Sequence, residues 1–276
     1  MKGNGSGRSG QRQGSGSRQG SGSRQGNGAR RGSQRRTRRP GLWASERMAE
    51  QMGYAVVAGL DEVGLGPLAG PAVAGAVVLR IGERLPGLND SKKLTADQRE
   101  RLDVLIRRRA VAWSVGAVSP EDIDRHGLTR ARQQAMRAAV AGLGVGAEYL
   151  LVDAWDVPQL PLPQLCVVKG DSTCASIMAA SVVAKVYRDR LMVEYDRQFP
   201  GYGFADHKGY ATAAHKRALW RLGPSPIHRM SWAPIRAVLA GDAASLEAAP
   251  EVGDIDAEAD ALARTHAGWD ADAGPA

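Results

Sequence analysis

Two apolar runs that flank a pair of acids and a glycine-rich turn constrain the fold of this chain more than any other stretch. The first run, residues 54–58, leads into Asp61 and Glu62, and the second, residues 72–79, leaves the turn that follows them. Short runs that are rich in β-branched residues and bounded by Gly and Pro are typical of buried strands. The segment therefore predicts two neighbouring strands, with two carboxylates at the end of the first.

Adjacent carboxylates at the end of a buried strand need a partner of opposite charge. Removing them from water costs roughly several kcal/mol unless a cation meets them, and Mg²⁺ prefers hard oxygen ligands of this kind. The glycines that follow, Gly64 and Gly66, would let a phosphodiester backbone approach closely. The alternative is that Asp61 and Glu62 occupy the turn of a solvated hairpin, and this stretch alone does not decide between the two.

Charge and composition divide the chain into three segments. Residues 1–40 contain 11 Lys and Arg and no acid among Gly, Ser and Gln, which predicts a disordered basic arm. Residues 241–276 contain nine acids and one Arg and are predicted to be an acidic, mostly disordered tail. Residues 41–240 have 25 basic and 20 acidic residues, a net charge of +5, and are predicted to fold. Basic charge on both the arm and the folded part suggests a polyanionic partner, although an arm that only aids solubility is an alternative.

Other features exclude several classes of protein. Two cysteines, Cys166 and Cys174, are too few for a disulfide scaffold or a zinc cluster and fit a reducing compartment. No run of about 18 apolar residues predicts a membrane helix, and the N-terminal region lacks the apolar core of a signal peptide. We therefore expect a cytoplasmic protein with no membrane partner.

The middle of the chain alternates between strand and helix patterns. Further strands are predicted at residues 112–118, 149–153 and 166–168, and helices at residues 95–109, 128–143, 173–197 and 213–222. Thr95 and Gln98 have the spacing of a capping box, and Ser119 with Pro120 predicts the start of a short helix. Strands interleaved with helices predict an α/β fold.

Two more acids follow predicted strands. Asp153 ends one strand, and Asp171 lies between the next strand and a long helix. Because ligands gather at strand ends in α/β sheets, these acids are predicted to converge with the first pair on one edge. Carboxylates in such a group are what two-metal phosphodiester hydrolysis requires. The structural alternatives are a strand-terminating turn for Asp153 and a helix N-cap for Asp171.

These motifs and their order resemble the ribonuclease HII family, the type 2 ribonucleases H. The resemblance covers roughly residues 54–236 and leaves both tails outside it. The matching segments are Gly59 to Pro71, Asp90 to Leu94, Glu121 to Met136, Leu151 to Asp153, Lys169 to Asp171, Ala180 to Arg190, His207 to Tyr210 and His228-Arg229.

The resemblance implies a ribonuclease H-like fold, a mixed five-stranded sheet flanked by helices, with a C-terminal helical extension. It implies that residues 41–240 form a catalytic domain that uses Mg²⁺ or Mn²⁺. The implied activity is endonucleolysis of the RNA strand of RNA:DNA hybrids and of duplex DNA that contains single ribonucleotides, which leaves a 3′-hydroxyl and a 5′-phosphate. Such an activity belongs to ribonucleotide excision repair and DNA replication. The four acids that match the metal-binding and catalytic positions are Asp61, Glu62, Asp153 and Asp171.

Further positions match nucleic-acid contacts of the family. The turn from Gly64 through Leu65 to Gly66 resembles the one whose backbone reads the ribose 2′-hydroxyl, the group that distinguishes RNA from DNA. Lys92 resembles a phosphate contact, and Lys169 lies in a matched segment and is assigned to the nucleic-acid interface as well. Tyr210 resembles the tyrosine that packs against the sugar at the RNA-to-DNA junction. We expect the protein to act as a monomer.

Two positions depart from the family pattern. The turn usually carries Arg where this chain has Leu65, and the loss of a guanidinium removes hydrogen bonds to phosphate. We expect weaker binding or relaxed junction preference, with the chemistry retained because all four acids are present. Ala154 stands where Gly is common, and its methyl group is expected to crowd the metal site slightly.

Two rival functions are considered. A dinucleotide-binding turn of the pattern G-x-G-x-x-A would have to open a helix, whereas residues 64–69 lead into a valine-rich strand. The second rival is a hybrid-binding protein with weakened catalysis and relaxed junction recognition, because Leu65 shows that the site has drifted. Loss of one of the four acids would indicate it, and none is lost.

Overall fold

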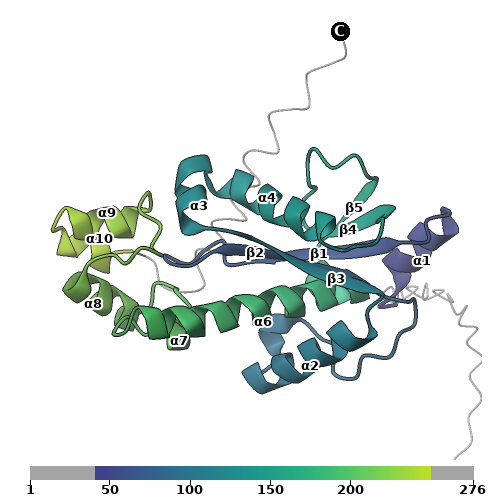
Figure 1. Ribbon diagram of the computed structural model, residues 1–276, viewed down its shortest axis with the longest axis horizontal. Helices are drawn as coiled ribbons and strands as arrows, with labels where there is room; N and C mark the ends of the chain where they lie inside the picture. Colours follow the sequence, from purple (N-terminus) through teal and green to yellow (C-terminus); the bar gives the residue numbers. More distant parts are fainter. Residues whose placement is uncertain (1–40, 250–276) are drawn as a thin grey trace, which may run out of the picture. The chain divides into compact units, whose positions relative to one another are not determined.

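The computed structural model describes residues 41–249, which contain a five-stranded mixed sheet (Figure 1). The strands are Val57–Val63 (β1), Ala72–Val78 (β2), Ala112–Val118 (β3), Tyr149–Asp153 (β4) and Gln164–Val167 (β5). They stand in the order β3-β2-β1-β4-β5. The first three pair antiparallel, whereas β4 runs parallel to both β1 and β5. The predicted mixed five-stranded α/β fold is confirmed.

Helices cover both faces of this sheet (Figure 1). They are Ala44–Gln51 (α1), Ala96–Arg109 (α2), Pro120–His126 (α3), Leu128–Ala141 (α4), Gly170–Thr173 (α5), Ala175–Gln198 (α6), Phe204–His207 (α7), Ala213–Leu222 (α8), Ala233–Leu239 (α9) and Ala243–Glu247 (α10), with a 3-10 turn at Ser91–Lys93. α4 packs on β2 and β3, and α6 packs on β1 and β2 with α2 outside it. The approach is close, because a Cβ at Gly75 would collide with the Ala180 carbonyl of α6 and one at Gly116 with the Ala135 carbonyl of α4.

Local sequence signals set several element boundaries as predicted. The Thr95 hydroxyl accepts a hydrogen bond from the Gln98 N–H at 3.3 Å, and the Gln98 side chain accepts one from the Thr95 N–H at 2.9 Å, which completes the capping box of α2. α3 begins at Pro120, after the N-cap Ser119. The predicted helix at residues 213–222 coincides with α8.

The sequence patterns do not predict α1, which caps the 24-residue helix α6. Its Glu46 side chain is 2% exposed and accepts hydrogen bonds from the N–H and the hydroxyl of Ser176, both at 2.9 Å. A carboxylate is stabilised there because the first N–H groups of a helix have no partner within it. Since 130 positions separate the two residues, no local pattern could reveal this cap.

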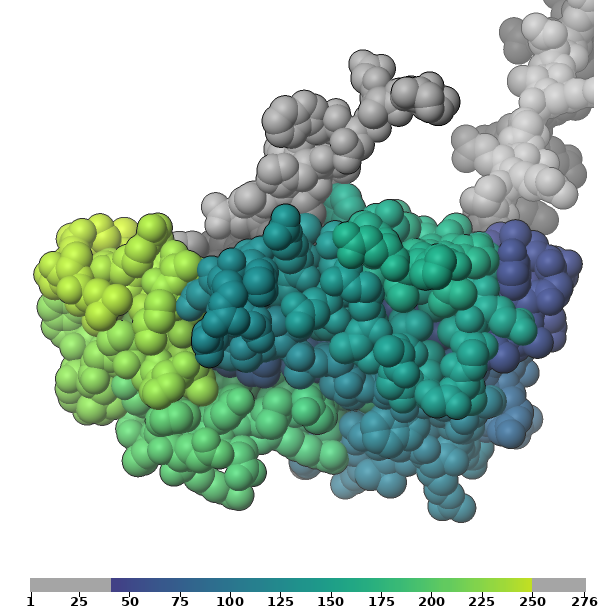
Figure 2. Space-filling view, turned by 45° about the horizontal axis from the view of Figure 1, so that its top comes forward, coloured from purple at the N-terminus to yellow at the C-terminus, as the bar shows by residue number. Residues whose placement is uncertain are grey.

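The C-terminal helices α7 to α10 gather at one end of the sheet (Figure 1). In Figure 2 the yellow C-terminal helices adjoin the blue-teal surface of α3, where the backbone N–H groups of Met230 and Ser231 donate to the Asp124 carboxylate at 2.6 and 3.0 Å. None of the helices described between residues 41 and 249 is long and apolar enough to cross a membrane.

Helix α10 lies beyond residue 240, where the sequence patterns place the start of the tail. Its Leu246 is 4% exposed and packs with Leu219 and Ile235, and Lys216 Nζ donates to the Glu247 carbonyl at 2.9 Å. This apolar contact extends the folded part through α10. The predicted arm at residues 1–40 and the rest of the predicted tail, residues 250–276, lie outside the described residues.

Candidate active site

The four acids singled out in the sequence line a single cavity of about 790 Å³. They are Asp61, Glu62, Asp153 and Asp171. Leu60 is the register partner of Val152 across parallel strands β1 and β4, so the next residue of each strand, Asp61 and Asp153, reaches the same edge. Asp171 lies on α5, the helix that follows β5, and β5 is the parallel neighbour of β4. The alternative that Asp171 is a helix N-cap is wrong, because it lies in the first turn of α5.

Burial and mutual repulsion disfavour ionisation of these carboxyl groups. Asp61 is 6% exposed, and burial together with the charges of Glu62, Asp153 and Asp171 raises its pKa well above the ordinary value. Burial and the Asp171 carboxylate raise the pKa of Asp153 to about 6, although the Gly170 N–H donates to its Oδ1 at 2.7 Å and opposes the shift. The neighbouring carboxyl groups of the cavity therefore repel one another when they are ionised.

Two cationic side chains reach this cluster. Lys92 Nζ lies 3.5 Å from Asp171 Oδ2, and Arg132 Nη1 lies 3.7 Å from Glu62 Oε1. Burial opposes the charge on Lys92, but the carboxylates of Asp171 and Asp61 outweigh burial and raise its pKa. The Lys92 side chain is still 77% exposed, so its ammonium can also contact a bound phosphate. Arg132, on α4, is a neighbour of the site that the sequence patterns did not indicate.

The donor set suits a hard divalent cation. Carboxylate oxygens are the ligands that Mg²⁺ and Mn²⁺ prefer, and a divalent cation would offset the repulsion among these carboxylates. Across residues 41–249, no three His, Cys, Asp or Glu side chains are already gathered as a ligand set. Asp171 instead faces Lys92, and Glu62 faces Arg132. A bound cation would therefore have to draw the carboxylates together against these ion pairs.

The glycine turn after β1 forms a wall of the same cavity. Gly64 has a φ angle of +83°, and a Cβ at this position would collide with the Arg188 side chain, so glycine is required. Gly64 and Leu65 line the cavity, whereas Gly66 is buried beside it. The half-buried Leu65 side chain packs against the core cluster between the sheet and α4, and it offers no hydrogen bond where the family pattern has Arg. The turn leads into β2 and not into a helix, which is inconsistent with a dinucleotide-binding turn.

A fully buried arginine that does not line the cavity holds this turn through its carbonyl oxygens. Arg229 is 0% exposed and donates to the carbonyl oxygens of Gly64, Leu65 and Gly70. The Nη1 to Leu65 distance is 2.6 Å, and two nitrogens lie 3.0 and 3.2 Å from the Gly70 oxygen. Burial and the nearby charge of Arg188 lower the pKa of Arg229. The sequence patterns place Arg229 in a matched segment but give it no role.

Arg188 of α6 holds the second half of the turn in the same way. It is 0% exposed, and its guanidinium donates to the carbonyl oxygens of Ala69 and Pro71, both at 3.1 Å, and of Lys208 at 3.0 Å. Its Cζ also lies 5.9 Å from the centre of the Tyr210 ring. One side chain therefore links the turn to the segment that carries Tyr210.

The other predicted nucleic-acid residues also line the cavity. Lys169 is exposed, has a φ angle of 56° and is the N-cap of α5, where its carbonyl accepts the Ser172 N–H at 3.0 Å. Tyr210 lines the carboxylate cavity and a neighbouring one as well. Ala154 is at the cavity too, with a φ angle of 56° that would suit glycine better. The structure thus brings the predicted contacts to one place, with Gly66 behind the wall.

A hydrogen-bond chain through two buried histidines holds the backbone of Tyr210. The Ser225 N–H donates to His228 Nδ1 at 2.8 Å, which makes Nε2 the protonated nitrogen of a neutral His228. That Nε2 lies 3.0 Å from Nε2 of His215, whose Nδ1 then donates to the Tyr210 carbonyl at 2.8 Å. Burial lowers the pKa of His215 to about 3 and that of His228 to about 4, so both rings are neutral at physiological pH. No sequence pattern pointed to His215.

Comparison with known proteins gives a consistent assignment. The family model described as Ribonuclease HII matches residues 58–235. A Ribonuclease HII of Geobacter sulfurreducens is 51% identical over 197 residues, which are 71% of this chain and 91% of that protein. One of Mycobacterium avium is 52% identical over 203 residues, 73% of this chain and 88% of that protein. The crystal structure of ribonuclease H2 from Pyrococcus horikoshii matches with a TM-score of 0.59 and 27% identity, over 68% of this chain and 98% of that one. The chain therefore belongs to the ribonuclease HII family and is an endonuclease of the ribonuclease H class.

Proposed function

We propose that this protein is a divalent-metal-dependent endonuclease that hydrolyses the RNA strand of RNA:DNA hybrids and nicks duplex DNA on the 5′ side of embedded ribonucleotides. The products would be a 3′-hydroxyl and a 5′-phosphate. Family membership supports an endoribonuclease of RNA:DNA hybrids. The observation that carries the rest is the convergence of four carboxylates, from β1, β4 and α5, in one cavity beside a glycine turn.

In this proposal the metal is Mg²⁺ or Mn²⁺, and its ligands are the four carboxylates of the cavity, Asp61, Glu62, Asp153 and Asp171. When bound, the metal supplies an activated water and stabilises the charge on the leaving oxygen. The Lys92 ammonium, 77% exposed beside Asp171, is placed to hold a phosphate oxygen of the substrate. Asp61 and Asp171 are 6% and 8% exposed, so bulk water weakens the interactions of these two carboxylates with a cation less than it would at the surface.

Ribose recognition is assigned to the backbone of the glycine turn. In a trans peptide the carbonyl of one residue and the N–H of the next point in opposite directions. The carbonyls of Gly64 and Leu65 both point to the buried Arg229, so the N–H groups of Leu65 and Gly66 point away from it. Gly64 and Leu65 line the cavity, whereas Arg229 does not. This geometry supports an N–H pair that faces the sugar of the nucleotide and donates to its 2′-hydroxyl.

The test is cleavage of a labelled DNA duplex that contains one ribonucleotide, with Mg²⁺ or Mn²⁺, beside an all-DNA duplex and the Asp61→Asn variant. We expect a nick on the 5′ side of the ribonucleotide by the unmodified protein, and none in the all-DNA duplex or with the variant. Cleavage of long RNA:DNA hybrids alone would show that Leu65 has cost the protein junction recognition. Binding of both substrates without cleavage of either would contradict the proposal and favour a hybrid-binding protein.

A further inference from the structure

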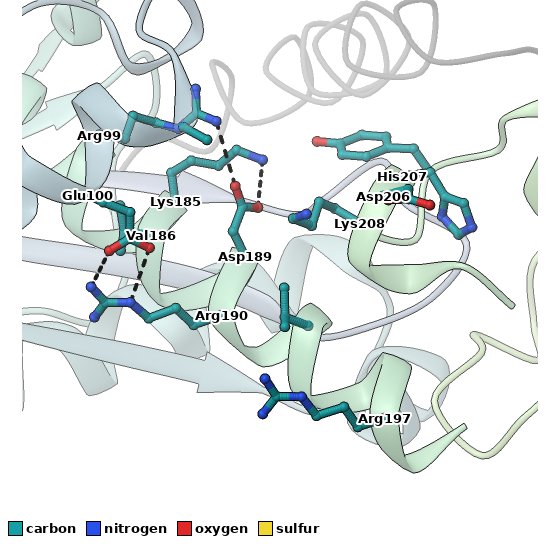
Figure 3. Close-up of a pocket in the computed structure, with 13 residues that line it drawn as sticks. Arg99, Glu100, Lys185, Val186, Asp189, Arg190, Arg197, Asp206, His207 and Lys208 are labelled. Atoms are coloured by element: carbon teal, nitrogen blue, oxygen red, sulfur yellow. Dashed lines mark hydrogen bonds and ion pairs between the residues drawn. The ribbon is translucent and has the colours of Figure 1, made fainter. Parts of the chain in front are cut away.

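A second cavity of about 770 Å³ adjoins the carboxylate cavity and shares Lys185 and Tyr210 with it. Its walls are α2, α6 and the segment at residues 206–210, and we call it the α2–α6 groove (Figure 3). Five basic and three acidic side chains line this groove. The basic ones are Arg99, Lys185, Arg190, Arg197 and Lys208. A groove with excess positive charge therefore continues from the acidic site.

The charges follow the α-helical repeat along one face of α6. Lys185, Asp189, Val193 and Arg197 are spaced by four residues, so they lie one turn apart on the same side of the helix. At about 1.5 Å per residue, the face from Lys185 to Arg197 is about 18 Å long. Since each strand of a duplex rises about 3.4 Å per nucleotide, that length matches about five base steps. A linear polymer fits such a row better than a small anion does.

The basic side chains differ in what they already contact (Figure 3). Asp189 accepts from Lys185 at 2.8 Å and lies 3.8 Å from Arg99, and Glu100 is paired with Arg190. Arg197 is exposed, lies apart from these pairs and has no ion pair or hydrogen bond among residues 41–249.

Lys208 also remains available to an anion. It donates to the Ala205 carbonyl and is in no ion pair within the described part of the chain. Arg197 and Lys208 therefore bring two positive charges that lie in no ion pair within residues 41–249, against the single unpaired acid of the groove, Asp206.

We propose that the α2–α6 groove binds the phosphodiester backbone of a nucleic-acid duplex that extends beyond the carboxylate cavity, with Arg197 as an outer contact. The inference rests on the proposed function. Five acidic side chains and four lysines line the carboxylate cavity, whereas five basic and three acidic side chains line the groove, so the groove attracts a polyanion more strongly than the cavity does. The groove thus holds the duplex in place while the scissile phosphate lies at the carboxylates.

The experiment measures binding by the full-length chain with the Asp61→Asn substitution, so that no substrate is consumed. Arg197→Ala and Arg197→Glu are compared with Arg108→Ala and Arg108→Glu, since Arg108 is also exposed but lies on α2 outside the groove. The probes are duplexes with one ribonucleotide and DNA of increasing length on either side. Dissociation constants are measured from about 50 to about 200 mM salt.

Loss of one phosphate contact lowers the slope of log affinity against log salt by about 0.9. We therefore expect Arg197→Ala to have a higher dissociation constant for long duplexes than Arg108→Ala. The ratio of the two dissociation constants should fall about 3.5-fold as the salt rises from about 50 to about 200 mM. The deficit should disappear when the duplex is shortened on one side. Equal affinities and slopes for the Arg197 and Arg108 variants, or a deficit that does not depend on length, would overturn the proposal. Failure of the unmodified protein to cleave the ribonucleotide duplex would instead count against the proposed function.

Discussion

Replacing Arg229 by Lys tests whether the glycine turn depends on the buried guanidinium. Arg229 makes four hydrogen bonds to three carbonyl oxygens and is 0% exposed. Lysine keeps the charge, but a single ammonium cannot span carbonyls that the planar guanidinium contacts from opposite edges. About two charge-assisted bonds are lost, each worth about 1.5–3 kcal/mol, while the desolvated charge remains. We expect the free energy of unfolding to fall by about 3–6 kcal/mol.

The Arg229→Lys variant should also lose activity beyond what its lower stability explains. If the N–H groups of Leu65 and Gly66 donate to the ribose, misplacing both costs about 1 kcal/mol each, which is roughly a 30-fold lower kcat/KM on a duplex with one ribonucleotide. Ile106→Ala is the matched control, because Ile106 is a fully buried residue of α2 in the apolar cluster that α2 forms with α6, away from the turn, and its truncation costs about 2–5 kcal/mol.

Urea unfolding and initial cleavage rates are measured for both variants at a temperature at which both are folded. An equal loss of kcat/KM in Ile106→Ala would attribute the effect to stability alone. Wild-type stability and wild-type cleavage in Arg229→Lys would refute the reasoning about the turn altogether.

Three further predictions concern affinity, pH and salt. Leu65→Arg should tighten binding of a duplex with one ribonucleotide by about tenfold, because a charge-assisted hydrogen bond to phosphate is added; unchanged affinity and cleavage position would count against it. His215 and His228 stay neutral in the fold, with pKa values of about 3 and 4 against an ordinary 6.5, so their contribution to stability is complete above pH 6.5 and is lost as pH falls toward 4. Urea unfolding measures the difference in free energy of unfolding between the unmodified protein and His215→Gln. This difference should narrow by up to about 1.4 kcal/mol per pH unit below pH 6.5. The carboxyl groups of the site have raised pKa values, but both proteins contain them, so their contribution cancels in the difference. Deletion of residues 1–40 should raise KM at low salt and flatten its salt dependence, and an unchanged salt slope would argue against an arm that binds nucleic acid.

Features of the fold that depend on neighbouring residues could be predicted from the sequence. The Thr95 capping box, Pro120 at the start of α3 and the bounds of α8 follow from contacts within a few positions, and the bounds of β3 follow from its run of alternating and β-branched residues although the strand pairs with the distant β2. The gathering of acids at one sheet edge also followed, because the strands that carry them are parallel neighbours. The first strand begins and ends later than the apolar run at residues 54–58 predicts. It runs from Val57 to Val63, because its last residues pair with β2.

Features that depend on contacts between distant residues could not be predicted. Glu46 caps α6 from 130 residues away, and Arg229 reaches Gly64 from 165 residues away. A single Glu, Arg or His carries no local pattern that distinguishes a buried, satisfied group from a surface one. Their hydrogen-bond partners here are backbone groups and uncharged side chains, so no complementary charge marks them in the sequence either.

The contacts of the glycine turn with distant residues explain why Leu65 is expected to affect substrate affinity more than the chemical step. The direction of the peptides on either side of Leu65 is set by carbonyl bonds to Arg229, which do not depend on the side chain at that position. The Leu65 side chain itself packs against the core, and Leu65 also lines the cavity. A leucine in place of arginine therefore removes one contact to the substrate without moving the N–H groups or the carboxylates. Arg229, which touches no carboxylate of the site, is by contrast the residue on which the placement of those N–H groups depends.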